Sequence, residues 1–281
     1  MRTTHVEAVM GTAVSFDVRS ESLGPAALRA AVAAACRVLH EAEAVFSTHR
    51  AASPMSRLRR GELTVDQCPP EVAAVLTACA RAREATAGWF DADAMPGGTD
   101  PTGLVKGWAA QQALDELVSH GVTAALVNAG GDAVAVGRPE PDRPWRLAVR
   151  DPFDPARWLC IVPLADAALA TSGTYERGAH VLDPRSGAPA SAGVVSASVT
   201  GPDLTVADAL ATALVAGGEL AVPAVSDVAG YAALLVLADR RLLRVGDFPA
   251  QPLPSAGPEG RQQGGLAGPA QPDPLQRTAR G

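Results

Sequence analysis

The chain has 281 residues, of which 47% are hydrophobic and 19% charged, an ordinary balance for a globular protein. Its formal net charge is −6, and sequence-independent contact with phosphates needs a concentrated basic face, so we expect no nucleic-acid partner. No apolar run approaches the roughly 18–20 residues of a membrane span. No apolar export segment follows Met1 either, which predicts a cytoplasmic protein without a membrane span.

The four cysteines are Cys36, Cys68, Cys79 and Cys160. They form no CxxC pair, and none is close to a histidine at a spacing typical of metal sites. We therefore expect buried free thiols, which pack as small apolar side chains.

The predicted elements mix helices and strands without regular alternation. In chain order they are a strand or hairpin bent at Gly11 (5–19), a helix (24–46), a polar loop (47–61), a helix (69–87), a turn-rich segment (88–103), a helix (104–119), strands from 122 to about 200, a helix from about 205, and a strand (231–239). Irregular alternation predicts an α+β fold, with mixed or antiparallel sheets packed against helices, rather than a doubly wound fold. Apolar residues become scarce after Phe248, which predicts one domain over 1–249 and a disordered Pro/Gly/Gln-rich tail over 250–281.

Two glycine-containing segments have patterns that suit ligand binding. The loop DPTGLVKG (100–107) leads into a helix, so its backbone N–H groups and Lys106 could hold a pyrophosphate. An ordinary loop-to-helix junction with a surface lysine is the alternative. Gly130 and Gly131, between two strands, would let a flat ligand approach the backbone, or would simply form a hairpin turn.

Two further segments contain groups suited to catalysis. His180 precedes an Asp-Pro turn and could move a proton or contact a phosphate, or could form a structural hydrogen bond to that turn. Asp208 and Thr212 are four residues apart on a predicted helix and could give Mg²⁺ two oxygen ligands. Alternatively, Thr205 and Asp208 form a capping box and the Thr212 hydroxyl bonds to a carbonyl within the helix.

The order of these segments resembles the ApbE family of FAD:protein FMN transferases. The resemblance runs from Met10 to about Gly217 and implies an α+β fold with FAD held in a cleft. The matching strings are MGT (10–12), STHRAASPMSRL (47–58), GWFD (88–91), DPTGLVKGWA (100–109), LVNAGGD (126–132), PW…VRDP (144–152), ATSGTYER (170–177), HVLDPRSG (180–187) and ADALATAL (207–214).

The resemblance also implies a set of site residues. Mg²⁺ would be bound by the side chains of Asp208 and Thr212 and by the carbonyl of Val105. Lys106, Asp208 and His180 would take part in the reaction, with either His180 or Asp208 removing the acceptor proton. The residues that contact FAD would be Met10, Asp91, Thr102, Gly103, Lys106, Asn128, Gly130, Gly131, Ser172, Gly173 and His180.

The activity that the resemblance implies is Mg²⁺-dependent transfer of FMN from FAD to a Ser or Thr hydroxyl of an acceptor protein, with release of AMP. An FAD pyrophosphatase, in which water is the acceptor, would use the same groups, and an FAD-binding protein without turnover is a third possibility. The sequence departs from the family pattern at Thr102, where a glycine is usual, and it lacks the usual Asn after Leu58. It also lacks the export signal that many relatives have.

Overall fold

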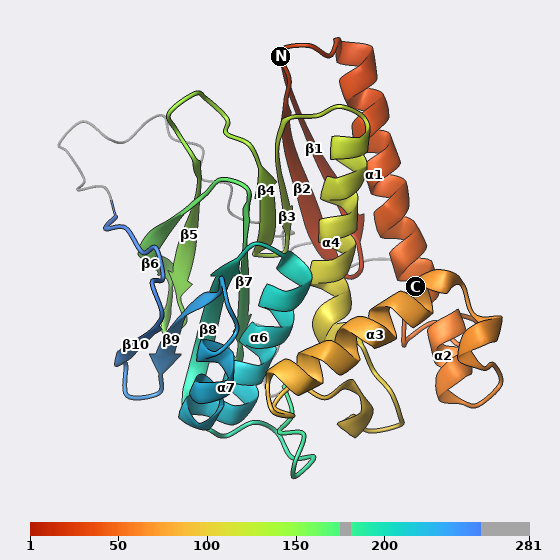
Figure 1. The fold of residues 1–281 in the computed structure, drawn as a ribbon, viewed down its shortest axis with the longest axis vertical. Helices are drawn as coiled ribbons and strands as arrows, with labels where there is room; N and C mark the ends of the chain where they lie inside the picture. The colour runs from red at the N-terminus through yellow and green to blue at the C-terminus, as the bar shows by residue number, and fades with distance from the viewer. Residues whose placement is uncertain (175–180, 254–281) are drawn as a thin grey trace, which may run out of the picture.

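The computed structural model describes residues 1–174 and 181–253 (Figure 1). Its main feature is an eight-stranded sheet in the order β1-β2-β3-β4-β7-β8-β9-β10, in which all neighbouring strands are antiparallel. The strands are β1 (Arg2–Val9), β2 (Thr12–Arg19), β3 (Ala124–Ala129), β4 (Asp132–Val136), β7 (Ala167–Gly173), β8 (Val194–Gly201), β9 (Ala232–Leu237) and β10 (Leu242–Val245). The predicted α+β class is confirmed.

The main helices cover one face of this sheet. α4 lies between α1 and α6 and contacts both, and α6 packs on β7 and β8 (Figure 1). The helices are α1 (Pro25–Phe46), α2 (Pro54–Arg59), α3 (Pro70–Ala85), α4 (Thr102–Ser119), α6 (Leu204–Gly217) and α7 (Val222–Ser226), with short 3-10 turns over Val65–Gln67, Ala92–Ala94 and Gly218–Ala221.

The two faces of the sheet bury different cores. The larger core lies between the sheet and the helices and includes Phe16, Leu117 and Leu210. On the opposite face, the separate hairpin of β5 (Trp145–Asp151) and β6 (Asp154–Leu164) covers a smaller core. Burial of apolar surface on both faces explains why strand residues are apolar without strict alternation.

The packed chain continues slightly beyond the predicted domain boundary at residue 249. Gln251 forms two backbone hydrogen bonds with Ile161 of β6, at 2.9 and 2.8 Å. Most of the predicted tail, residues 254–281, lies outside the described residues.

One local prediction is wrong, and the structure excludes one of the alternatives for α6. The segment predicted as a polar loop contains α2, because Ser53 caps its first turn by accepting a hydrogen bond from the Ser56 N–H at 3.0 Å. The start of α6 is capped by Asp203, which accepts from the Val206 N–H at 2.9 Å, so Thr205 and Asp208 form no capping box. Asp208 is instead buried within α6, where it accepts a hydrogen bond from the Gly107 N–H of α4.

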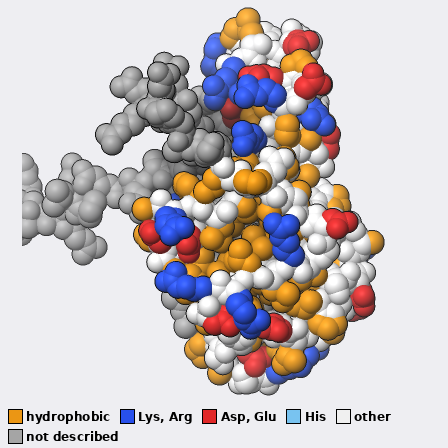
Figure 2. All heavy atoms as spheres, turned by 90° about the vertical axis from the view of Figure 1, so that its left-hand side faces the viewer, with side chains coloured by type: hydrophobic (Ala, Val, Ile, Leu, Met, Phe, Trp, Pro, Cys, Tyr) orange, Lys and Arg blue, Asp and Glu red, His pale blue; other side chains and the backbone are white. Residues whose placement is uncertain are grey.

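The surface and the apolar helix bear on two sequence expectations. On the face shown in Figure 2, basic side chains lie beside acidic and apolar ones and form no continuous basic surface. One described stretch, Leu204–Ser226, is long and apolar enough to cross a membrane, which corrects the expectation that no such stretch exists. In this fold 61% of the most apolar part of this stretch is buried inside the protein, as in a core helix.

Three cysteines are buried as predicted, whereas Cys68 is partly exposed.

Candidate functional site

Helices α4 and α6 approach each other very closely at Gly107 and Asp208. The Gly107 N–H donates a hydrogen bond to Asp208 Oδ2 at 2.9 Å, and Asp208 is 5% exposed. A Cβ at position 107 would lie 2.7 Å from the Leu204 carbonyl oxygen and 2.8 Å from Asp208 Cβ. Only glycine therefore allows this crossing, and the crossing places a carboxylate in a nearly water-free position.

Thr212 lies one turn after Asp208 on α6, so both side chains point to the same side. The Thr212 hydroxyl is 3.4 Å from the Gly103 carbonyl oxygen of α4 and 3.2 Å from the Ser172 hydroxyl of β7. Val105 stands between Gly103 and Gly107 on α4, and its side chain is buried. The structure thus brings four predicted site residues together where α4, α6 and β7 meet. They are Gly103, Ser172, Asp208 and Thr212, and the predicted role of the Val105 carbonyl remains a prediction.

Lys106 is fixed by an ion pair with Asp132. Asp132 is the first residue of β4 and is 1% exposed, and its Oδ1 accepts a hydrogen bond from the Thr171 N–H at 2.8 Å. A buried carboxylate bonded in this way holds the lysine ammonium against the end of β4. Sequence reasoning gave Asp132 no role. The available signal was a charged residue at the start of an otherwise apolar strand.

Two tight turns lie side by side at one end of the sheet. Met10 and Gly11 connect β1 to β2 with φ of +53° and +70°, and Gly130 and Gly131 connect β3 to β4 with φ of +63° and +107°. The Gly130 N–H donates to the Ala13 carbonyl at 3.2 Å, which joins the two turns.

Gly130 and Asn128 help to form the turn at this end of the sheet. A Cβ on Gly130 would lie 2.5 Å from Thr12 Oγ1, so any side chain at this position would force Thr12 to move. Asn128 Oδ1 accepts from the Gly131 N–H at 2.9 Å and stabilises the turn. Direct contact of Asn128, Gly130 and Gly131 with a flavin remains a prediction.

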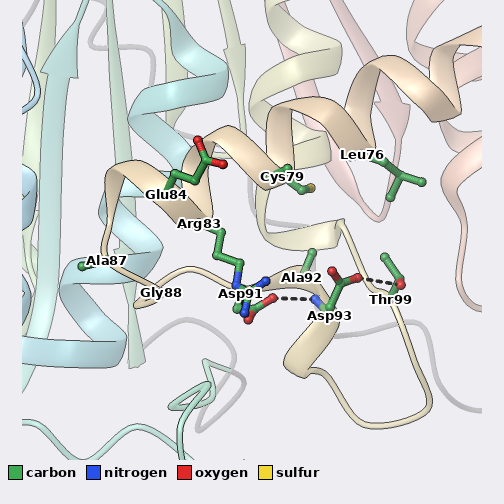
Figure 3. A pocket seen from close by; sticks show the side chains of 11 residues that line it. Leu76, Cys79, Arg83, Glu84, Ala87, Gly88, Asp91, Ala92, Asp93 and Thr99 are labelled. Carbon is green, nitrogen blue, oxygen red and sulfur yellow. Dashed lines mark hydrogen bonds and ion pairs between the residues drawn. The ribbon is translucent and has the colours of Figure 1, made fainter.

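Asp91 and Thr102 are engaged outside the Asp208 cluster. Asp91 forms an ion pair with Arg83 at 2.9 Å and accepts a hydrogen bond from the Asp93 N–H at 2.9 Å. These groups line a cavity of about 550 Å³ between α3 and residues 88–99 (Figure 3). No other predicted site residue lines this cavity. Thr102 has an exposed position at the start of α4, where its N–H bonds to Asp100 Oδ1 at 3.0 Å.

His180 lies outside the described residues, so its predicted role stays a prediction. The turn that follows it is well defined, because Asp183 accepts hydrogen bonds from the Arg185 N–H at 2.9 Å and from the Ser186 hydroxyl at 2.8 Å. These bonds hold the pKa of the Asp183 carboxyl below its usual range. The Arg185 guanidinium lies 3.6 Å from the centre of the Trp89 ring, which joins the turn to the GWFD segment.

A family model described as the ApbE family matches residues 10–98 and 97–235. The chain belongs to the ApbE family. Among its relatives, the FAD:protein FMN transferase of Rhodobacter capsulatus is 37% identical over 142 residues, which are 48% of this chain and 27% of that protein. The FAD:protein FMN transferase of Treponema pallidum is 33% identical over 157 residues, which are 50% of this chain and 43% of that protein. The chain thus matches less than half the length of each relative.

Solved structures of ApbE proteins have the same fold. The flavin transferase ApbE from Vibrio cholerae superimposes with a TM-score of 0.76 at 22% identity, covering 88% of this chain and 98% of that chain. An ApbE protein from Thermotoga maritima gives a TM-score of 0.75 at 23% identity, covering 89% and 100% of the two chains. At 22% and 23% sequence identity, the similarity to these two structures establishes the fold alone.

Proposed function

We propose that this ApbE-family protein transfers FMN from FAD to a Ser or Thr hydroxyl of an acceptor protein and releases AMP. The observation that carries the proposal is the nearly buried Asp208 carboxylate, bonded to the Gly107 N–H, with the Thr212 hydroxyl one turn away. The names of the two relatives above support the same reaction class. FAD and a flavin acceptor protein are therefore the proposed partners.

The residues at the α4–α6 crossing fit a magnesium ion. Asp208 and Thr212 offer a carboxylate and a hydroxyl oxygen on one helix face, and Mg²⁺ prefers oxygen ligands supplemented by substrate phosphates and water. Val105, between Gly103 and Gly107, is the proposed source of a backbone carbonyl ligand. When bound, the ion neutralises negative charge on a pyrophosphate and improves AMP as a leaving group.

The proposed roles of the chain's own residues follow from their charges and positions. Lys106, held by Asp132, offers a fixed positive charge to the phosphates one turn inside α4. Ser172 and Gly103, in contact with Thr212, form the wall of the same site. The acceptor hydroxyl must lose its proton as its oxygen attacks phosphorus, and His180 and Asp208 are the two candidate bases.

The test is to incubate the full chain with FAD, Mg²⁺ and a protein domain that contains an Asp-x-x-[Ser/Thr]-Gly-Ala-[Ser/Thr] sequence. We expect the domain to gain the mass of FMN while AMP is released. Asp208→Asn should abolish both products, because the substitution keeps an oxygen for the Gly107 N–H but removes the charge. Asp203→Asn is the matched control, since Asn caps a helix as well as Asp.

The other outcomes identify the alternatives. AMP and free FMN without labelling of the acceptor would favour the pyrophosphatase, in which water replaces the hydroxyl. FAD binding without any product would indicate a flavin-binding protein. The proposal fails if FAD does not bind, or if Asp208→Asn labels the acceptor as fast as the unchanged protein does.

A further inference from the structure

Four side chains with metal-binding chemistry meet between β1 and α1. His5 and Glu7 are two residues apart on β1, so both point to one face of this edge strand. Cys36 and His40 are four residues apart on α1, so they lie one above the other on one face of the helix. The two faces meet, because α1 packs beside β1 (Figure 1).

The distances bring His5, Glu7 and Cys36 into one cluster, with His40 hydrogen-bonded to Glu7 at its edge. Glu7 Oε2 lies 2.8 Å from His5 Nε2, and Glu7 Oε1 lies 2.9 Å from His40 Nε2. The ligand atoms of His5, Glu7 and Cys36 are all within 4.8 Å of one another. A tetrahedral Zn²⁺ has nitrogen ligands at about 2.0–2.1 Å and sulfur at about 2.3 Å, which separates its ligand atoms by roughly 3.3–3.8 Å. His5, Glu7 and Cys36 are near these separations, and a side-chain movement that brings His40 from its contact with Glu7 toward the thiol would supply the fourth ligand.

The burial of the cluster is graded from the surface inward. The side chains of His5 and His40 are 41% and 50% exposed, and that of Glu7 is 26% exposed. Cys36, at 8% exposed, forms the floor. Cys36 and His40 are four residues apart in the sequence, a spacing that was not recognised as one for a metal site, and folding brings His5 of β1 close to the same thiol.

The donor atoms of the cluster suit a metal ion. The two carboxylate oxygens of Glu7 each contact one imidazole ring, so nitrogen and oxygen donors already point toward the thiol of Cys36. Imidazole, thiolate and carboxylate together suit a borderline divalent ion such as Zn²⁺.

We propose that His5, Glu7, Cys36 and His40 form a binding site for one Zn²⁺ or chemically similar transition-metal ion. On binding, the Cys36 thiol releases its proton to solvent and its sulfur bonds to the metal. The site shares no residue with the Asp208–Thr212 cluster, which is built from α4, α6 and β7. It ties the first strand to the first helix, and a bound ion stabilises the folded chain by mass action.

The test uses the full chain after dialysis against a chelator. Zn²⁺ is titrated in competition with a chromophoric chelator, and Co²⁺ is added separately to look for a thiolate-to-cobalt charge-transfer band. We expect one ion per chain, a charge-transfer band, and a higher melting temperature with Zn²⁺. Cys36→Ser should remove the band, and His40→Gln should weaken Zn²⁺ binding by at least about 10–100-fold.

Matched controls separate this site from others in the chain. His120 forms a similar exposed pair with Glu116 at 3.2 Å, so His120→Gln should change nothing, and neither should Cys68→Ser. Asp208→Asn should keep Zn²⁺ binding, because it affects only the proposed Mg²⁺ site. His40 is half-exposed, so its variant should fold even if Cys36→Ser does not, and circular dichroism checks both. The proposal is overturned if the unchanged protein does not bind one Zn²⁺ per chain. It is also overturned if the folded Cys36→Ser and His40→Gln variants bind Zn²⁺ with the same affinity as the unchanged protein.

Discussion

Lys106 of α4, a predicted FAD contact, forms an ion pair with Asp132 of β4 that connects the helix layer to the sheet. The carboxylate is 1% exposed, and the lysine side chain is 26% exposed. The pair explains how a lysine, which is flexible in isolation, is kept in one orientation.

Asp132→Asn should weaken FAD binding while leaving the fold intact. The amide oxygen can still accept from the Thr171 N–H, but the charge that holds Lys106 is lost. Replacing the charged Asp132 by a neutral Asn weakens its bond to Lys106 by about 1–2 kcal/mol. If this loss is passed on to FAD binding, the dissociation constant for FAD should rise roughly 5–30-fold. Fluorescence titration with FAD measures this effect. Asp115→Asn, at an exposed position of α4, is the control, and equal affinities for both variants would contradict the proposed role of Lys106.

Gly107→Ala should destabilise the protein and disturb the Asp208 carboxylate. The added methyl group would lie 2.7 Å from the Leu204 carbonyl oxygen, so α4 and α6 must move apart. Overpacking of this kind costs about 1–3 kcal/mol. Urea unfolding measures the loss of stability, and the acceptor assay should show the accompanying loss of transfer.

Gly103→Ala is the matched control for the stability measurement. Its methyl group would approach Phe90 and Thr212 only to 3.4 and 3.7 Å, which is close to ordinary contact. Alanine also favours a helix over glycine by about 1 kcal/mol, so the free energy of unfolding should stay unchanged or rise. If both variants lose the same stability, the close crossing at Gly107 is not the cause.

Some of this arrangement could be predicted from sequence because it depends on local spacing. Asp208 and Thr212 share a helix face wherever α6 lies, and the paired glycines of the β3–β4 turn require positive φ. The helices α1 and α4 could be predicted for the same reason, since their apolar periodicity and their boundaries are local signals.

The rest depends on contacts between distant parts of the chain. Asp132 meets Lys106 only because β4 lies under α4, and Cys36 meets His5 only because α1 packs on β1. The six-residue helix α2 gave too short a pattern for periodicity, although Ser53 and Pro54 were usable start signals. The start of α6 is ambiguous in the sequence for a similar reason. Asp203 caps the helix, but Thr205 and Asp208 also match a capping box that would begin two residues later.

Thiol alkylation should distinguish Cys68 from the buried cysteines. Burial and the nearby carboxylates of Asp93, Asp100 and Asp91 raise the pKa of Cys79 to about 12, so its reactive thiolate is scarce at pH 8. Burial also raises the pKa of Cys160. With iodoacetamide at pH 8, peptide mass spectrometry should therefore find Cys68 modified first, and Cys79 and Cys160 only after unfolding. Rapid labelling of Cys79 in the folded protein would contradict its burial.

Met10→Asn should raise stability and lower FAD affinity at the same time. Met10 has φ of +53°, a left-handed conformation that is unfavourable for most side chains, and the next residue is Gly11. Asn followed by Gly is the preferred pair for a two-residue hairpin turn, so the free energy of unfolding should rise by about 0.5–1 kcal/mol. Strain of this kind persists where a side chain has a function, and the Met10 side chain is a predicted FAD contact.

Urea unfolding and FAD titration of Met10→Asn measure the two effects independently. Arg240 has φ of +69° in the turn between β9 and β10, at the opposite edge of the sheet from Met10, so Arg240→Asn provides the comparison. That variant should bind FAD as the unchanged protein does. If Met10→Asn is more stable and binds FAD with unchanged affinity, the Met10 side chain has no part in FAD binding.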